Sequence, residues 1–464
     1  MRLFRLHYLF FIIIIVFLSL LFLGAIIIKK DWETFHIQYG SNYHPYKWVN
    51  YYIDLNIQKI YHNIFNQIDS DLPKVRVILP EKSLVAINSN LPDSGKIWQP
   101  AFLIDEKNKL SKIEMRTKGD NPLNWAFEKK TWRIKINKKN YSGGLRTIDY
   151  VIPDVLSFNR YFVNYLSKAF DLVTPSLRIV ELEFNGVNQG VYYEIEKLDE
   201  DFLRRNNFMP VNLYKGSQFR REKYVAMDTN IFNNASLWSK TATFNKLNYH
   251  NKEDLSFFLN QIRKFETNQI SPDDFFYSFP IDYWSKFMGT GHHIHSNSKI
   301  NHRVICDPWS GWIIPLINDP KMYDFTQVSE IANDELDRIF NLDPKFVLFK
   351  YKNYFNYILK KNVLLNLADD FNKLKKPLIT ALKKDYNLTQ NYYYQFLDSN
   401  YRTPNYFKNI IENYVVLLKK LSSDQINFFQ RKIKTNWNYS NQKLRIKIDD
   451  QLPIGKIKID LKNK

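Results

Sequence analysis

The sequence contains a single cysteine, Cys306, among 464 residues. One thiol excludes an internal disulfide framework and any zinc site that is built from several cysteines. Cys306 stands in the apolar run RVIC, which predicts a buried and unreactive thiol. Internal repeats and low-complexity segments are also absent. With 45% hydrophobic and 16% aromatic residues, the chain has ample material for a large folded core.

Acidic residues are fewer than basic ones, 47 against 66, and the formal net charge is +19. Such a balance is compatible with nucleic acid, anionic lipid or phosphate-bearing ligands. The basic residues are spread along the chain rather than gathered in one run, and the richness in Lys, Asn, Ile, Phe and Tyr is also typical of an AT-rich genome. We therefore expect no nucleic-acid partner.

Long apolar runs are limited to the N-terminus, where Tyr8–Ile28 contains 21 residues without a charge. At ~1.5 Å per residue such a helix matches the ~30 Å hydrocarbon core of a bilayer. The run is longer than the core of a cleavable signal, and no A-x-A site follows it. Two cations flank each side, and the amino terminus adds to the inner count. The sequence predicts a single-pass membrane protein whose soluble body is exported to the periplasmic or extracellular side.

The pattern along the chain divides it into five expected parts. These are a signal anchor over residues 1–30, a stalk with one amphipathic helix over 31–74, a sheet-rich lobe over 75–216, a mainly helical lobe over 217–435, and a β-hairpin tail around Pro453–Gly455 over 436–464.

Strand patterns dominate the sheet-rich lobe. VRVIL and SLVAIN follow residue 74, and the segments Lys112–Asp120 and Thr131–Asn137 alternate apolar and polar residues like half-buried strands. Ser157–Val173 has helical spacing with Ser157 as the expected N-cap. Asn185-Gly186, between two further strand patterns, is a strong hairpin signal. Together these signals predict an antiparallel sheet, and the later run WIIPLIND is typical of a buried strand.

Several cations fall on two neighbouring strands of this predicted sheet. Residues two apart on a strand share a face, so these side chains either hold a polyphosphate or form a solvated face. Glu194 and Glu196 share another face and either could pair with a lysine. The cations concerned are Arg116, Lys118, Lys130, Arg133 and Lys135.

Asp319 ends the apolar run WIIPLIND. A buried strand does not tolerate an unpaired carboxylate, and coordination of a hard cation such as Mg²⁺ would satisfy it. Asn301 could supply a neutral oxygen ligand to the same ion.

Three segments of the sequence carry a family resemblance: RTKGD followed by KKTWRIKI, LEFNGVNQGVYYEIEKLDEDFLRR, and INHRVICDPWSGWIIPLINDP. They resemble the CotH kinase family, the spore-coat protein H-like atypical protein kinases. RTKGD followed by KKTWRIKI is similar to the family's first strand pair, and INHRVICDPWSGWIIPLINDP is similar to its catalytic segment. The most specific match is LEFNGVNQGVYYEIEKLDEDFLRR, followed by LYKG (Leu213–Gly216). The resemblance covers roughly Val75–Phe349.

This resemblance implies an α+β fold of the atypical protein-kinase type. An antiparallel-sheet lobe and a mainly helical lobe would lie behind one N-terminal transmembrane helix, with a catalytic-loop-like segment at 292–325. ATP and Mg²⁺ or Mn²⁺ would be the cofactors. Arg116, Lys130 and Lys215 would lie near the nucleotide, and Glu196 would orient the lysine. Asn301 and Asp319 would hold the metal, with Asp324 replacing a second carboxylate of the family pattern.

The catalytic-loop segment departs from the family at one position. Kinases place an Asp base five residues before the metal-binding Asn, and counting back from Asn301 gives Ser296. The same stretch, HHIHSNSKINHR, holds four of the nine histidines, including His295 and His302. Four interpretations of this stretch remain open. It is a zinc site, a degraded loop without a base, a working loop in which His295 takes the proton, or a polar loop without a ligand role.

Two functions follow from these observations. The first is a membrane-anchored CotH-like ATP-dependent phosphotransferase that modifies a protein or an envelope glycan outside the cytoplasmic membrane. The second is a pseudokinase that binds a nucleotide, glycan or protein partner in the same cleft. A third class, a basic protein that binds anionic envelope polymer without a defined site, would show strong salt dependence and no metal requirement.

Overall fold

In a computed structural model of the chain, the described residues are 11–19, 21–22, 24, 69–104, 108–120, 124–125, 129–137, 145–153, 158–208, 210–216, 219–220, 225–226, 230–242, 252–289, 301–318, 335–385, 404–430, 435–440 and 443–448.

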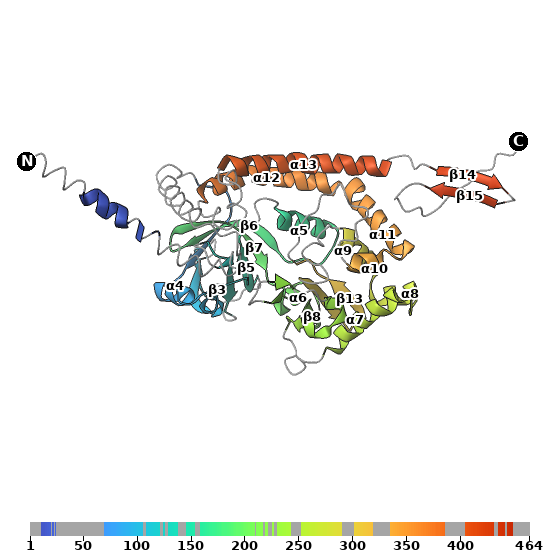
Figure 1. Ribbon diagram of the computed structural model, residues 1–464, viewed down its shortest axis with the longest axis horizontal. Helices are drawn as coiled ribbons and strands as arrows, with labels where there is room; N and C mark the ends of the chain where they lie inside the picture. The colour runs from blue at the N-terminus through green and yellow to red at the C-terminus, as the bar shows by residue number, and fades with distance from the viewer. Residues whose placement is uncertain are drawn as a thin grey trace, which may run out of the picture.

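Seven strands close into a barrel at one end of the molecule (Figure 1). Neighbouring strands pair antiparallel, except that the first strand pairs parallel with the sixth and so closes the ring. In order around the barrel the strands are β1 (Lys74–Ile78), β2 (Gln99–Ile104), β3 (Leu110–Thr117), β4 (Trp132–Ile136), β5 (Thr147–Val151), β7 (Val187–Glu196) and β6 (Leu177–Phe184). Helix α4 (Glu81–Asn88) and the 3₁₀ turn η3 (Ser94–Lys96) connect β1 to β2.

Apolar residues at every second position fill the barrel interior. On β3, Ile113 and Met115 are buried, and on β4 the same holds for Trp132 and Ile134. The residues between them, such as Arg116, point to the outside because successive side chains alternate across a strand. The alternation seen in the sequence is therefore confirmed as the division between core and outer face.

The predicted hairpin at Asn185-Gly186 is confirmed as the turn between β6 and β7. Both residues have positive φ, 51° and 83°, which Asn and Gly tolerate better than other residues. The Asn185 amide also donates to the Leu79 carbonyl and accepts from the Leu79 N–H, so the turn is fixed to the end of β1.

A second, four-stranded sheet lies beside the barrel. Its strands, in order, are β11 (Trp238–Lys240), β8 (Asn212–Gly216), β12 (His302–Asp307) and β13 (Trp312–Pro315). The buried strand expected within WIIPLIND is thus present as β13. Helices α6 (Glu200–Arg205), α7 (Glu253–Glu266), α8 (Pro272–Ser278) and α9 (Ile281–Gly289) surround this sheet (Figure 1). A small two-stranded sheet is formed by β9 (Phe219–Arg220) and β10 (Val225–Ala226).

Two long helices, α12 (Val363–Lys384) and α13 (Pro404–Gln430), run side by side along the molecule (Figure 1). Helix α12 contacts both α5 (Asn159–Ala169) and β7 of the barrel. The aromatic rings of Phe162, Phe371 and Tyr414 join α5, α12 and α13 in one core. The remaining elements are α10 (Glu335–Phe340), α11 (Pro344–Phe355), the π-helical turn η9 (Asn356–Lys360) and the hairpin β14 (Thr435–Ser440) and β15 (Lys443–Ile448).

The predicted fold class, a kinase-like antiparallel-sheet lobe and helical lobe behind a transmembrane helix, is wrong. The sheet does not stay open but closes through the parallel pairing of β1 with β6. A separate sheet joins β8 to strands that follow much later in the chain. Strand periodicity fixes which residues face inward but not whether the first and last strands meet, and this is why the closure was missed.

The predicted membrane anchor, and with it the single-pass exported localisation, is also corrected. No helix within the described ranges combines the length and the apolar character needed to cross a bilayer.

Three local predictions can also be compared with the structure. SLVAIN belongs to helix α4 rather than to a strand, because Ser83 and Ile87 recur at helical spacing and share its buried face. Helix α5 begins at Asn159 after Phe158, and Ser157 lies outside the described residues. The C-terminal hairpin is formed by β14 and β15, and the predicted turn at Pro453–Gly455 also lies outside those residues.

Candidate functional site

Two arginines lie opposite each other on the outer face of the barrel. Arg116 on β3 pairs in register with Arg133 on β4. Like charges directly across an antiparallel pair destabilise a sheet, so this arrangement needs compensation. The Arg116 guanidinium donates to the Lys96 carbonyl at 3.0 Å and lies 4.6 Å from the centre of the Trp98 ring. Its buried Nε has no hydrogen-bond partner among the described residues.

Asp149 on β5 provides part of this compensation. Arg133 donates to both of its carboxylate oxygens, at 2.5 and 2.9 Å, and the Lys118 Nζ lies 3.2 Å away. Burial would raise the pKa of Asp149, but Lys118 and Arg133 outweigh that effect and lower it to about 2. The carboxylate is therefore ionised throughout the physiological pH range and holds both cations in place.

The second sheet presents another like-charged pair. Lys215 on β8 lies opposite Arg303 on β12. The Nε and one terminal nitrogen of Arg303 are buried and have no hydrogen-bond partner within the described part of the chain. A guanidinium that leaves two donors unused in a buried place loses its hydration without replacing it. An anion entering this place would supply the missing acceptors.

The two pairs lie near each other, since Arg133 acts electrostatically on both Lys215 and Arg303. Burial lowers the pKa of Lys215 to about 8, and Arg303, Lys118 and Arg133 lower it as well. Burial also lowers the pKa of Lys118 to about 8, with Asp149 opposing this shift. For Arg303 burial, with a further contribution from Arg133, lowers the pKa to about 10. We call these five residues the cation cluster: Arg116, Lys118, Arg133, Lys215 and Arg303.

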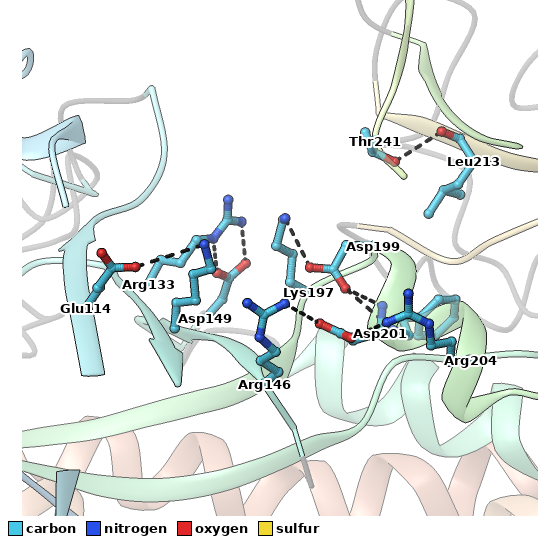
Figure 2. A network of polar contacts seen from close by, with 12 residues as sticks. Glu114, Arg133, Arg146, Asp149, Lys197, Asp199, Asp201, Arg204, Leu213 and Thr241 are labelled. Carbon is cyan, nitrogen blue, oxygen red and sulfur yellow. Dashed lines mark hydrogen bonds and ion pairs between the residues drawn. The ribbon is translucent and has the colours of Figure 1, made fainter. Parts of the chain in front are cut away.

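Negative charge near the cation cluster is in short supply. Figure 2 shows the Arg133–Asp149 pair beside two other ion pairs, Lys197–Asp199 and Arg146–Asp201. Asp199 acts on Arg133 from a distance, but Lys197 already neutralises it at 3.1 Å. Asp120 likewise acts on Lys215 and is itself paired with Lys96. Glu114, on the same face, is paired with Lys135 at 4.0 Å. Asp149 is thus the carboxylate that contacts two of the five cations within the described structure, and the cluster keeps a net positive charge.

This arrangement suits a ligand with several negative charges. Arginine offers forked donors and lysine a compact charge, and both recognise phosphate oxygens. Of the residues predicted to bind the cofactor, Arg116 and Lys215 belong to the cation cluster.

The other two predicted cofactor residues, Lys130 and Glu196, have contacts of their own. Lys130 is buried, and its carbonyl accepts from the Tyr192 hydroxyl at 3.1 Å. Glu196 is bonded by the Arg205 guanidinium through both oxygens and accepts from the Ser176 N–H at 3.1 Å. The lysine–carboxylate contact of the cation cluster is instead Lys118–Asp149.

The neighbouring lysine, Lys129, has a different environment. Its ammonium forms an ion pair with Asp385 in which neither side chain is exposed. Asp385 follows the last turn of α12, accepts from the Val191 N–H at 2.8 Å, and lies against Gly190, where no side chain would fit. This pair joins α12 to the barrel and has no access to a ligand.

The His-rich loop and the predicted metal ligands are described only in part. His292, His293, His295, Ser296, Asp319 and Asp324 lie outside the described residues. Asn301 is described: its backbone has φ 67°, and its carbonyl accepts from the Asn318 amide at 3.2 Å. His302 is buried against the rings of Phe232 and Trp238, so it is a core residue of β12 rather than a surface ligand.

Within the described ranges, no three His, Cys, Asp or Glu side chains come together in a way that could hold a metal ion. Both Asp149 oxygens are already bonded to cations. The described residues therefore provide no ligand set for Mg²⁺ or Mn²⁺, and we derive no step through a metal.

Two members of the site were not selected from the sequence. Asp149 stands in the strand TIDYV, where a carboxylate amid buried residues carries the same signal that drew attention to Asp319. Arg303 had no local signal, because its significance depends on Lys215, which is far away in the sequence.

Residues 115–279 match the family model described as CotH kinase protein. This segment of the chain belongs to the CotH family. The match includes four members of the cation cluster and covers just over a third of the chain. It confirms the resemblance recognised from the sequence motifs and suggests a kinase-like function. Among curated proteins, no significant match to the chain was found.

Proposed function

We propose that the cation cluster binds the phosphates of a nucleoside triphosphate and that the protein is a CotH-like ATP-dependent phosphotransferase. One observation carries this proposal. Two cross-strand pairs of like charge, Arg116–Arg133 and Lys215–Arg303, lie near a single carboxylate, that of Asp149. Repulsion among these cations is relieved when a polyphosphate lies between them. Phosphoryl transfer depends mainly on positioning and on neutralisation of charge, which such a cluster supplies.

Asp149 and four members of the cluster have separate parts in this proposal. Asp149 holds Lys118 and Arg133 at a fixed separation, in the way that a carboxylate orients the phosphate-binding lysine of kinases. Arg303 contributes the two unused guanidinium donors, and Lys215 adds charge beside it. This assignment gives Lys118 and Asp149 the roles that the family resemblance implied for Lys130 and Glu196.

In the transfer step, an oxygen of an acceptor hydroxyl forms a bond to the γ-phosphorus as the bond from that phosphorus to the β,γ-bridging oxygen breaks. ADP leaves with the bonding electron pair, and the hydroxyl proton passes to a base or to water. The acceptor is a protein or a glycan. Ser296 stands where kinases have an aspartate base, so His295 is the residue proposed to accept the proton.

The alternative is a pseudokinase that binds a nucleotide without transferring phosphate. The replacement of the base by Ser296 favours it. The two functions share the cation cluster and differ only in turnover.

The test is transfer of labelled γ-phosphate by the full chain, with Mg²⁺ or Mn²⁺, to protein and glycan acceptors. Transfer by the unmodified chain that Arg303→Ala abolishes would support the phosphotransferase. Binding of ATP without transfer, with transfer gained in Ser296→Asp, would support the pseudokinase. Lys345→Ala serves as the matched control, because Lys345 is an exposed lysine paired with Asp273 on a distant helix. Failure of the unmodified chain to bind ATP would reject both.

A further inference from the structure

A half-buried tryptophan continues the line of the cation cluster across the barrel. Gln99 on β2 pairs with Met115 on β3, so the preceding residue, Trp98, lies opposite Arg116. Arg116 pairs with Arg133, and Arg133 pairs with Asp149 on β5. The four side chains Trp98, Arg116, Arg133 and Asp149 therefore form a row over β2, β3, β4 and β5, all on the outer face.

The position of the Trp98 ring is fixed by cations. The Arg116 guanidinium lies 4.6 Å from the ring centre, and the Lys135 ammonium lies 5.8 Å from it. Such contacts stabilise a ring that is not enclosed by a hydrophobic core. Trp98 is not a member of the barrel core, and the adjacent Ile97 is 60% exposed. The ring is thus half-buried and held in place by the cations that lie over it.

The order of the row corresponds to the order of groups in a nucleotide. Neighbouring strands are ~4.8 Å apart, so Trp98 lies about 10 Å from Arg133, which faces the second sheet. Phosphates held among Arg116, Arg133 and Arg303 would let the ligand extend along the row and bring its base to Trp98. An indole is the side chain on which a nucleobase stacks most readily.

We infer that Trp98 is the base-stacking platform of the nucleotide site, so that the ligand of the cation cluster is a nucleoside triphosphate rather than a simple polyphosphate. This inference rests on the proposed function. Stacking discriminates poorly between bases because every base has a π-face. The site is therefore expected to take GTP nearly as well as ATP, and purine nucleotides better than pyrimidine nucleotides.

The experiment measures the affinities of ATP and of inorganic tripolyphosphate for the full chain and for Trp98→Ala, Trp98→Phe and Trp309→Ala, by calorimetry. Trp98→Ala should weaken ATP binding roughly 5- to 150-fold and leave tripolyphosphate binding unchanged. Trp98→Phe should keep most of the ATP affinity. Trp309 is an exposed tryptophan in the turn between β12 and β13, so Trp309→Ala should change neither affinity.

Equal affinities of ATP and tripolyphosphate, unchanged in Trp98→Ala, would overturn the platform and leave the phosphate site intact. A parallel loss of both ligands in Trp98→Ala would also overturn it, since the ring would then act only by positioning Arg116. If the unmodified chain bound neither ligand, the proposed function itself would fail. Thermal unfolding of each variant confirms that the compared proteins are folded.

Discussion

Two lysine–aspartate contacts of the barrel, Lys129–Asp385 and Lys118–Asp149, differ in how their charges are balanced. Lys129 and Asp385 are both fully buried and matched one to one. Lys118 is 28% exposed and shares Asp149 with Arg133, while Lys215 and Arg303 add further positive charge nearby.

The difference separates a structural ion pair from a binding site. A buried pair of opposite charges fixes the geometry of the fold, and removing one partner leaves an uncompensated charge. A cluster with excess charge of one sign is destabilising until a ligand enters. Lys118 and Lys129 are close in sequence, yet only Lys118 is placed to contact a ligand.

The largest effect is expected from Lys129→Ala. It leaves the Asp385 carboxylate buried and unpaired, so the free energy of unfolding should fall by about 3–5 kcal/mol. Urea denaturation followed by circular dichroism measures this. Lys345→Ala, at an exposed ion pair, should lose less than ~1 kcal/mol. A loss below ~1 kcal/mol in Lys129→Ala would remove the distinction between the two contacts.

The next largest effect concerns Lys215→Ala and Arg303→Ala. Each removes a charged donor to the phosphates, which corresponds to about 1.5–3 kcal/mol, so the Kd of ATP should rise roughly 10- to 150-fold. Stability should stay equal or increase, because a like-charged cross-strand neighbour is removed. Calorimetry and urea denaturation measure the two quantities. Variants that lose stability but keep their ATP affinity would show that the cluster is structural.

The pH dependence of binding should follow the two lysines. In the free protein Lys118 and Lys215 have pKa values of about 8, so both are charged at pH 7 and lose their protons as the pH rises through that value. An anion restores the protonated forms, and each pH unit above 8 then costs about 1.4 kcal/mol per lysine. Tripolyphosphate affinity should fall steeply between pH 8 and 9.5 in titrations at constant ionic strength.

Lys215→Arg provides the control for this titration. Arginine stays charged over the whole range, so the variant should show a shallower decline than the unmodified chain. An affinity independent of pH between 7 and 9.5 in the unmodified chain would mean that neither lysine contacts the anion.

The smallest effect is expected for Glu196→Gln. Its partners are Arg205 and the Ser176 N–H. The glutamine oxygen can still accept from the Ser176 N–H and from one terminal nitrogen of Arg205, as Oε2 does, but the amide nitrogen cannot accept from the Arg205 Nε. The free energy of unfolding should fall by about 1 kcal/mol, and the Kd of ATP should stay within a factor of about two. A tenfold loss of ATP affinity would instead indicate that Glu196 orients a phosphate-binding lysine, as the family resemblance implied.

Local pattern predicted part of the fold and part of the site. The alternation in KIEMRT and WRIKI placed Arg116 and Arg133 on the outer face of neighbouring strands, and Asn185-Gly186 placed the hairpin. Arg116 and Lys215 were selected through the resemblance to the CotH family. The closure of the barrel was not predictable in this way, because strand periodicity carries no information on the pairing of β1 with β6.

The partners of the site residues were equally inaccessible to local reasoning. The sequence KKTW does not distinguish Lys129 from Lys130. Only the tertiary structure shows that Lys129 is enclosed, because its partner Asp385 is packed against Gly190 and neither side chain of the pair is exposed. Glu196 matches the family pattern, but the fold gives it Arg205 as its partner.

The sequence by itself determined the family of residues 115–279, the strands and turns of local origin, and the excess of basic residues. Only the tertiary structure decided which of those basic residues share a space. Arg303 lies opposite Lys215 because β12 pairs with β8, and Arg133 acts electrostatically on both because the second sheet lies beside the barrel. Charge repulsion acts through space rather than along the chain. The accumulation of positive charge at one place therefore depends on packing between segments that are distant in sequence.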